Sequence, residues 1–232
     1  MIHLIKTGYY QQAKNFLRNG LVLYLDAGNT NSYSGTGDDW YDISDNENNA
    51  KLNNCSYSSD NGGSIVFNGS SGYANISNNL SNLTTTPATI SCWIKASYAN
   101  GNQIVFGNYT TKIGLGLYYS GGVKYFIVKV GSGSDAKPIF NVNSEFINDA
   151  FNHVVVTYDE STNSNLWLNN VQITTTGSTN YWTWTVDETN IGKRSTGTYL
   201  KGNVYNIQVY DRILSETEIS LNYNVDKSRF GL

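Results

Sequence analysis

A dense group of acidic side chains lies early in the chain, between positions 38 and 47. It consists of Asp38, Asp39, Asp42, Asp45 and Glu47, with Asn46 and Asn48 beside them. Ca²⁺ takes about six to eight oxygen ligands, and carboxylates and amides supply them. The four aspartates are therefore a candidate Ca²⁺ site, but the D-x-D-x-D-G spacing of an EF-hand loop is absent. Capping of turns by their side chains is the favoured alternative.

Two further groups combine aromatic rings with amides, the side chains that carbohydrate recognition needs. The first group is Tyr98, Asn100, Asn102, Tyr109 and Tyr118, with Tyr119 next in the chain. The second is Tyr181, Trp182 and Trp184, which follow Asn180. In a strand, alternation places Trp182 and Trp184 on one face, where they serve either a ligand or the core. For every aromatic residue named here the core role is the alternative, as it is for Trp40, Trp93 and Trp167.

Residues for covalent or acid–base catalysis are scarce. The chain has two His, and only His153 lies beyond the first few residues. No zinc-ligand spacing, Cys-His pairing or phosphate-binding glycine loop occurs. Cys92 lies in the strand-like run TISCWIK, which favours a small buried hydrophobe, while its pairing with Cys55 stays open. We therefore expect a protein that is not an enzyme and requires no cofactor.

The composition indicates what must position these groups. Asn (32), Ser (24), Thr (21) and Gly (22) make up 99 of 232 residues, whereas only 14% are charged. Amide and hydroxyl side chains favour turns, and the abundant Tyr, Trp, Val, Ile and Thr favour pleated sheet. A mainly helical protein is excluded, and the length suits one large β domain.

Charge and hydropathy limit the classes of partner that the chain is expected to bind. The net charge of −3 and the pI near 5.3 argue against nucleic acid, which needs a basic surface. No run approaches the ~18 consecutive apolar residues of a membrane span, so membrane insertion is not expected. The N-terminal residues lack the apolar core of a secretory signal, so the chain either avoids that route or has lost a signal, and Met1 favours the former.

Short alternating segments separated by Gly, Asn and Asp predict an antiparallel sandwich or barrel. The sharpest hairpin is Leu166–Ile173, in which Asn169-Asn170 tolerate the positive φ of a type I′ turn. The predicted strands are Leu21–Leu25, Ser64–Phe67, Tyr73–Ile76, Thr89–Ala96, Gln103–Phe106, Ile113–Tyr119, Lys124–Val130, His153–Asp159, Ser164–Leu168, Val171–Ile173, Thr189–Ile191 and Lys201–Tyr210.

The two ends differ from the middle. Residues 1–19 carry basic but no acidic side chains, with apolar residues at three-to-four spacing, so they predict a short amphipathic helix ended by Asn19-Gly20. This segment is either an arm or a terminal helix packed on the domain. Near the other end, Ser215 and Glu218 form a capping box that opens a second short helix. We divide the chain into the arm 1–19, a domain 20–225 and a basic tail 226–232.

The order of several motifs resembles the laminin-G-like domains of the concanavalin A-like lectin/glucanase superfamily. The motifs are Leu21-Val-Leu-Tyr-Leu-Asp26, Trp40-Tyr-Asp42-Ile-Ser44-Asp-Asn46-Glu-Asn48, Ser64-Ile-Val-Phe67-Asn-Gly69, Thr89-Ile-Ser-Cys-Trp93-Ile-Lys95, His153-Val-Val-Val-Thr157-Tyr158-Asp159 and the segment from Gly202 to Ser215. The resemblance implies an all-β, two-sheet antiparallel jelly-roll sandwich of 12 to 14 strands.

The resemblance also bears on the candidate residues. Such domains often bind Ca²⁺ at a loop rim, but in them the Asp and Ser of the W-x-D-x-S motif, here Asp42 and Ser44, are expected to cap turns. His153 is expected to be structural. Glucanases of this fold use an E-x-D-x-x-E strand that supplies paired carboxylates, and no E-x-D triplet occurs here.

Both ends are similar to those of laminin-G-like virion proteins of tailed bacteriophages. The matching segments are Gly20–Asn29 and Leu221–Leu232. The resemblance implies a structural virion protein of a capsid surface, neck or tail fibre, assembled in the bacterial cytoplasm, with a lectin-like domain that adheres to glycans. Residues 1–19 would contact other virion subunits, and a symmetric homo-oligomer is expected. The alternatives are a free carbohydrate-binding module and, less favoured, a glycoside hydrolase.

Overall fold

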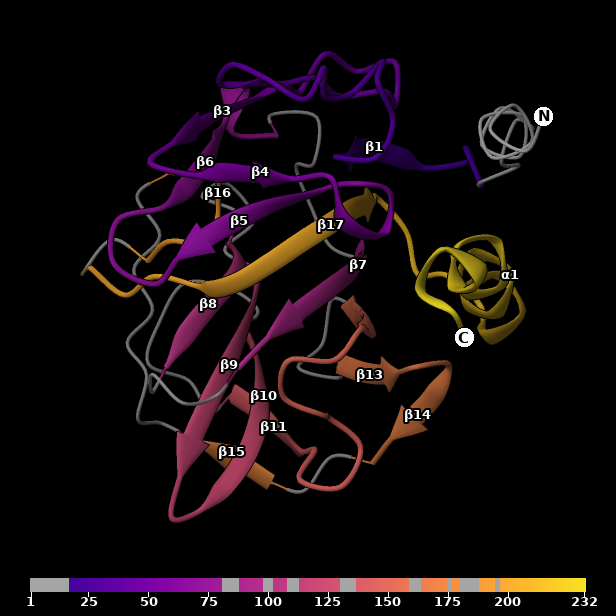
Figure 1. Ribbon diagram of the computed structural model, residues 1–232. Helices are drawn as coiled ribbons and strands as arrows, with labels where there is room; N and C mark the ends of the chain where they lie inside the picture. Colours follow the sequence, from indigo (N-terminus) through magenta and orange to yellow (C-terminus); the bar gives the residue numbers. More distant parts are fainter. Residues whose placement is uncertain are drawn as a thin grey trace, which may run out of the picture.

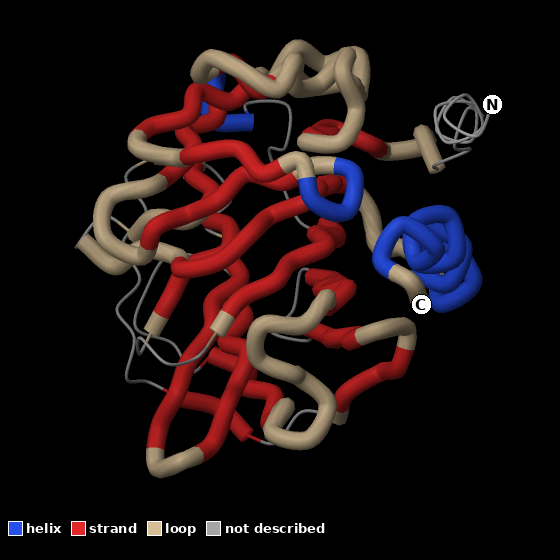
Figure 2. Tube along the Cα trace, viewed as in Figure 1, coloured by secondary structure: helices blue, strands red, loops and turns tan. Residues whose placement is uncertain are grey.

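Two antiparallel sheets face each other in the computed structural model, which describes residues 17–80, 88–97, 102–107, 113–129, 137–158, 164–174, 177–179, 188–194 and 197–232 (Figures 1 and 2). The eight-stranded sheet has the order β14 (Val171–Ile173), β13 (Ser164–Leu168), β12 (Asn152–Tyr158), β7 (Ala88–Ala96), β17 (Lys201–Tyr210), β5 (Ser64–Asn68) and β4 (Ser56–Ser58), and β1 (Leu21–Asp26) also pairs with β17. The predicted all-β jelly-roll sandwich is confirmed.

The second sheet has nine strands. Their order is β15 (Gly177–Thr179), β11 (Lys137–Asn141), β10 (Val123–Lys129), β9 (Gly114–Ser120), β8 (Gln103–Gly107), β16 (Asn190–Ile191), β6 (Tyr73–Ile76), β3 (Ala50–Asn53) and β2 (Asp39–Trp40). Three short 3₁₀ helices, η2 (Asp60–Gly62), η3 (Ser77–Leu80) and η5 (Lys227–Phe230), and one α-helix, α1 (Glu216–Asp226), complete the described part.

The main core lies between the sheets and follows from the alternation of side chains along each strand. Cys92 of β7 and Val154 of β12 point inward from the eight-stranded sheet, while Phe126 of β10 and Phe140 of β11 belong to the same core from the other sheet. All four are fully buried. Cys92 is the buried small hydrophobe that its sequence predicted, and it and Cys55 are both free thiols.

The outer face of the eight-stranded sheet is buried as well, because the C-terminal segment covers it. Ile219 of α1 packs in a cluster with Trp167 and Val155, and Phe230 of η5 packs with Trp93 and Tyr205. The tail predicted for 226–232 thus begins in α1 and continues through η5 with Phe230 buried. Trp40, Trp93 and Trp167 all have the buried roles proposed as their alternative.

The twelve predicted strands are present, each within one residue of its predicted ends in the described part. The strand number implied by the resemblance, 12 to 14, is too low, because the described residues form seventeen strands. The additional ones are β2, β3, β4, β11 and β15, which have two to five residues each. Segments this short carry too few positions for alternation to stand out from the surrounding polar sequence.

The predicted turn and cap are also confirmed. Asn169 and Asn170 have φ of 50° and 68°, as a type I′ turn requires. Ser215 and Glu218 form the reciprocal capping box that begins α1. The amphipathic helix predicted for residues 1–19 falls mostly on residues 1–16, outside the described part, and residues 17–19 are not helical. In the described part, no helix is long and apolar enough to cross a bilayer.

Candidate functional site

The outer face of the nine-stranded sheet carries a row of two tyrosines and an amide, which we name the tyrosine patch. Tyr118 of β9 lies directly opposite Tyr125 of β10, and Tyr125 lies opposite Asn141 of β11. The tyrosine rings are tilted, with centroids 5.8 Å apart. All three side chains are half-buried, so each presents part of its surface at this face.

Buried aliphatic side chains support the tyrosine patch. Tyr118 packs against Ile104 and Ile127, which are fully buried and lie two positions along the strands on the same side of the sheet. Ile139 packs against the same pair. The Tyr118 ring is therefore held on the sheet by aliphatic neighbours on the same face.

A second polar group lies further along the same face, on β6, β16 and the segment before β16; we name it the amide patch. The side-chain amide of Asn75 donates to Oε2 of Glu188 at 3.0 Å and to Oδ1 of Asn190 at 3.2 Å. Tyr73 lies two residues before Asn75 on the same side of β6, with the Lys193 ammonium 4.1 Å from its ring centroid. This patch offers amide groups, a carboxylate and an ammonium group, which can donate or accept hydrogen bonds, beside an aromatic ring.

The structure describes only part of the predicted sugar-binding set. Tyr118 is in the tyrosine patch, and Asn102 is half-buried just before β8. Tyr98, Asn100, Tyr109, Tyr181, Trp182 and Trp184 lie outside the described residues. Tyr119, next to Tyr118, is 46% exposed and is directed to the opposite side of β9 by the alternation of the strand.

Sequence reasoning missed Tyr125, Asn141 and the amide patch. A signal for Tyr125 was available, because the two-residue Gly121-Gly122 turn fixes the register that pairs Tyr118 with Tyr125. The amide patch joins Asn75 to Glu188 across more than 100 residues, and no local pattern marks that pairing.

The four aspartates of the predicted Ca²⁺ site are engaged by backbone groups or by basic side chains. Asp42 accepts hydrogen bonds from the backbone N–H groups of Tyr24, Ser44 and Asn48 and from the Ser44 hydroxyl, at 2.8 to 3.0 Å. It therefore ties its loop to β1, the turn-capping role implied by the resemblance.

The other three carboxylates pair with basic side chains on the surface. Lys51 lies 3.4 Å from Asp38 and 3.0 Å from Asp39, and Arg18 lies 3.0 Å from Asp45. Within the described ranges, no three His, Cys, Asp or Glu side chains come together as metal ligands would. Ca²⁺ binding at this loop stays a prediction from the sequence.

A serine–histidine pair lies on the outer face of the eight-stranded sheet. Ser91 Oγ and His153 Nε2 are 3.0 Å apart, but both residues are buried. The rings of Trp93 and Tyr223 lie against the imidazole, with centroids 5.0 and 5.6 Å away. Burial lowers the pKa of His153 to about 3. The imidazole is therefore neutral and covered, which fits the structural role predicted for it.

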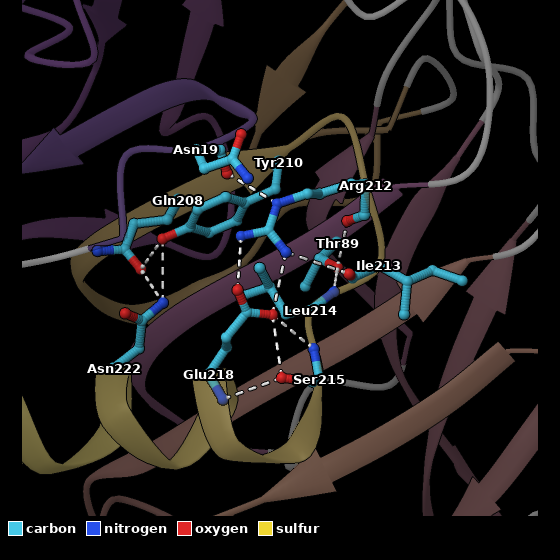
Figure 3. A network of polar contacts seen from close by, with 10 residues as sticks. All are labelled: Asn19, Thr89, Gln208, Tyr210, Arg212, Ile213, Leu214, Ser215, Glu218 and Asn222. Atoms are coloured by element: carbon cyan, nitrogen blue, oxygen red, sulfur yellow. Dashed lines mark hydrogen bonds and ion pairs between the residues drawn. The ribbon is translucent and has the colours of Figure 1, made fainter.

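A polar network attaches the first turn of α1 to the eight-stranded sheet (Figure 3). Arg212 forms two hydrogen bonds with the Glu218 carboxylate, at 3.0 and 2.8 Å, and donates a third to the carbonyl of Asn19 at 2.8 Å. The hydrogen bonds from Arg212, with further ones from Ser215, lower the pKa of Glu218 to about 2. Thr89 accepts from the Leu214 N–H and donates to the Arg212 carbonyl. This network fixes the helix to β7 and β17.

The two-sheet sandwich, with its aromatic and amide groups on an outer face, defines a protein of the lectin-like class. A family model described as the concanavalin A-like lectin/glucanases superfamily matches residues 68–220, more than half of the chain. The chain therefore belongs to this superfamily, as its motifs predicted. No curated protein sequence matches the chain.

Solved structures share the fold at low sequence identity. The chain is similar to Trypanosoma rangeli sialidase in complex with sialic acid, with a TM-score of 0.63 and 17% identity over 90% of this chain and 33% of that one. It is similar to domain 4 of AbnA, a GH43 arabinanase from Geobacillus stearothermophilus, in complex with arabinotriose, with a TM-score of 0.61 and 15% identity over 89% of this chain and 98% of that one.

A third similarity is to the receptor binding domain of botulinum neurotoxin C/D mosaic serotype, with a TM-score of 0.61 and 14% identity over 90% of this chain and 52% of that one. The chain thus spans about a third of the sialidase and about half of the neurotoxin domain. Identities this low establish the shared fold alone.

Proposed function

We propose that this domain is a carbohydrate-binding module that holds a neutral glycan on the tyrosine patch. The observation that carries the proposal is the row of Tyr118, Tyr125 and Asn141 on three adjacent strands. Neighbouring strands are about 4.8 Å apart, so the row spans about 10 Å, the size of about two sugar rings.

The chemistry of the row suits saccharides. Aromatic rings offer an apolar surface for the C–H faces of a sugar, and the Asn amide both donates to and accepts from hydroxyl groups. All three side chains are neutral, which favours an uncharged glycan over an acidic one. The arabinanase domain that shares this fold was solved with arabinotriose, and this agrees with the proposal without determining the ligand here.

The proposal is tested by binding to an array of neutral and acidic glycans, followed by titration of the best ligand. Tyr118→Ala and Tyr125→Ala should each weaken binding about tenfold or more, as expected for removal of a central aromatic contact. Tyr119→Ala is the matched control, since Tyr119 lies on the same strand but points to the other side. Equal losses from all three variants, or no binding to any glycan, would reject the tyrosine patch.

We further propose that the domain binds without catalysis. Glycoside hydrolysis uses two carboxylic side chains flanking the scissile bond. Among the described residues of the two patches, Glu188 is the one carboxylate. Incubation with the bound glycan should release no reducing sugar, whereas steady release that Glu188→Gln abolishes would show an enzyme.

The setting that we propose for this module is a bacteriophage particle, and the resemblance of both chain ends to virion proteins supports it. Coding sequences for portal, capsid or tail proteins beside this one would agree with that setting. Neighbouring genes for polysaccharide-degrading enzymes would favour the alternative, a free carbohydrate-binding module.

A further inference from the structure

The hydrogen bonds of the amide patch fix which way its central side chain faces. The Asn75 side-chain nitrogen donates to Oε2 of Glu188 at 3.0 Å and to Oδ1 of Asn190 at 3.2 Å. Because an amide has two N–H groups, these contacts engage both, and Asn75 Oδ1 lies on the opposite side of the amide. Asn190 is buried and donates to the Glu188 carbonyl at 3.3 Å. A buried amide thus positions the two outer side chains.

Two oxygen atoms of these outer side chains keep their acceptor capacity. In the ranges that the structure describes, no N–H or O–H group donates to Asn75 Oδ1 or to Glu188 Oε1. The Asn75 side chain is half-buried and the Glu188 side chain is exposed. A ligand at this end of the patch must therefore supply the hydrogens, and two neighbouring hydroxyl groups can do so.

A donor lies at the other end of the patch. Lys193 Nζ is 4.1 Å from the Tyr73 ring centroid and forms no ion pair within the described part of the chain. Tyr73 and Asn75 lie on the same side of β6, two residues and about 7 Å apart. One sugar ring with its hydroxyl groups covers this span, so it can donate at the Asn75 end and accept at the Lys193 end.

The two charges of the patch favour an uncharged ligand. They lie within a Debye length of each other, about 8 Å at physiological ionic strength, so an ionised group on the ligand meets a like charge on one side. Glu188 repels an anion and Lys193 repels a cation. The Lys193 ammonium also covers one face of the Tyr73 ring. Binding here would therefore depend on hydrogen bonds more than on ring stacking.

We propose that the amide patch is a second carbohydrate site, which binds one neutral sugar residue through two adjacent hydroxyl groups. The inference rests on the proposed carbohydrate-binding function and adds a site of different chemistry to it. Asn75 and Glu188 accept from the two hydroxyl groups, and Lys193 donates to a third oxygen of the same sugar. The tyrosine patch, by contrast, offers mainly ring surface.

NMR titration of the ¹⁵N-labelled full chain with methyl glycosides of neutral hexoses and pentoses tests the proposal. The side-chain amide signals of Asn75, assigned from their loss in Asn75→Ala, should shift and saturate with at least one glycoside. Glu188→Ala should weaken that binding about tenfold, because it removes a charged acceptor. Glu216→Ala is the matched control, since it removes an exposed carboxylate from α1, beside the other sheet, and it should leave the affinity unchanged. Equal affinities of the two variants would overturn the proposal.

Modified sugars test which ligand groups are recognised. A deoxy derivative that lacks one of the two adjacent hydroxyl groups should bind about tenfold more weakly than its parent glycoside. The corresponding hexuronate glycoside should bind no more tightly than the neutral one. Tighter binding of the hexuronate, abolished by Lys193→Met, would overturn the proposal in favour of an acidic sugar.

The same spectra separate the second site from the first. Shifts at Asn75 that persist when Tyr118→Ala and Tyr125→Ala are combined would support the second site, whether or not the tyrosine patch binds. Shifts confined to Tyr118 and Tyr125 would support the tyrosine patch and overturn the second site. If no glycoside shifts either group of signals, both proposals are wrong.

Discussion

Asp26 and Arg229 form a buried ion pair that joins the first strand to the last turn of the chain. Asp26 Oδ1 and Arg229 Nη1 are 2.8 Å apart, with side chains only 6% and 4% exposed. The guanidinium also donates to the carbonyls of Asn61 and Gly63, at 2.8 and 2.6 Å. Its charge is thus matched by a carboxylate and two backbone oxygens, so the C-terminal segment is fixed to β1 and to the loop around η2.

Arg229→Met should destabilise the domain by about 3–5 kcal/mol, because it leaves the Asp26 carboxylate buried without its partner. Urea unfolding measures the change. Arg18→Met is the control, since Arg18 and Asp45 are 63% and 86% exposed and such surface pairs contribute about 1 kcal/mol or less. Equal effects of the two substitutions would show that the buried pair has no special role.

Acid should destabilise the fold through His153. Its folded pKa of about 3 lies below the ordinary value of 6.5, so the fold favours the neutral imidazole. The stabilisation is complete above pH 6.5 and is lost as the pH falls toward 3, at up to about 1.4 kcal/mol per pH unit. His153→Gln, which cannot protonate, should flatten the dependence of the free energy of unfolding on pH in this range. Parallel curves for the two proteins would contradict this.

Glu218 should contribute to the pH dependence of folding stability at lower pH than His153 does. Its folded pKa of about 2 lies below the ordinary value of 4.5, so its stabilisation is present above pH 4.5 and is lost as the pH falls toward 2. Glu218→Gln keeps an oxygen that can accept from Ser215 but loses the charge that pairs with Arg212. We expect about 1 kcal/mol of destabilisation at neutral pH, and a smaller further loss between pH 4.5 and 2 than in the unmodified protein. If the variant loses as much stability between pH 4.5 and 2 as the unmodified protein does, other carboxylates cause that loss.

Local features of the fold could be predicted because their causes are local. The turn at Asn169 and the capping box at Ser215 depend on residues within three positions of each other, and the longer strands repeat their alternation several times. By contrast, Asp26 and Arg229 are 203 positions apart, and nothing around either residue indicates its partner. The short strand β4, with the sequence SYS, owes its conformation to pairing with β5.

The candidate site was predictable only in part for the same reason. Tyr118 was selected because it is an aromatic residue in a region rich in Tyr and Asn. Its row with Tyr125 and Asn141 depends on the register of three strands, of which the third, β11, was not predicted. Residue type therefore indicated the chemistry, whereas the geometry required the pairing of strands.

Two glycines with nearly the same positive φ should respond differently to substitution by alanine. Gly192 and Gly197 have φ of 82° and 83°, where any side chain is strained. A Cβ at Gly192 would lie 2.4 Å from Cδ1 of the buried Phe67 ring, whereas a Cβ at Gly197 would meet no atom of the described residues within 4 Å. Gly197→Ala should therefore cost about 1 kcal/mol from backbone strain. Gly192→Ala should cost about 1–3 kcal/mol more, because the core around Phe67 must shift. Urea unfolding of the two variants measures the difference, and equal losses would mean that the Phe67 ring moves aside freely.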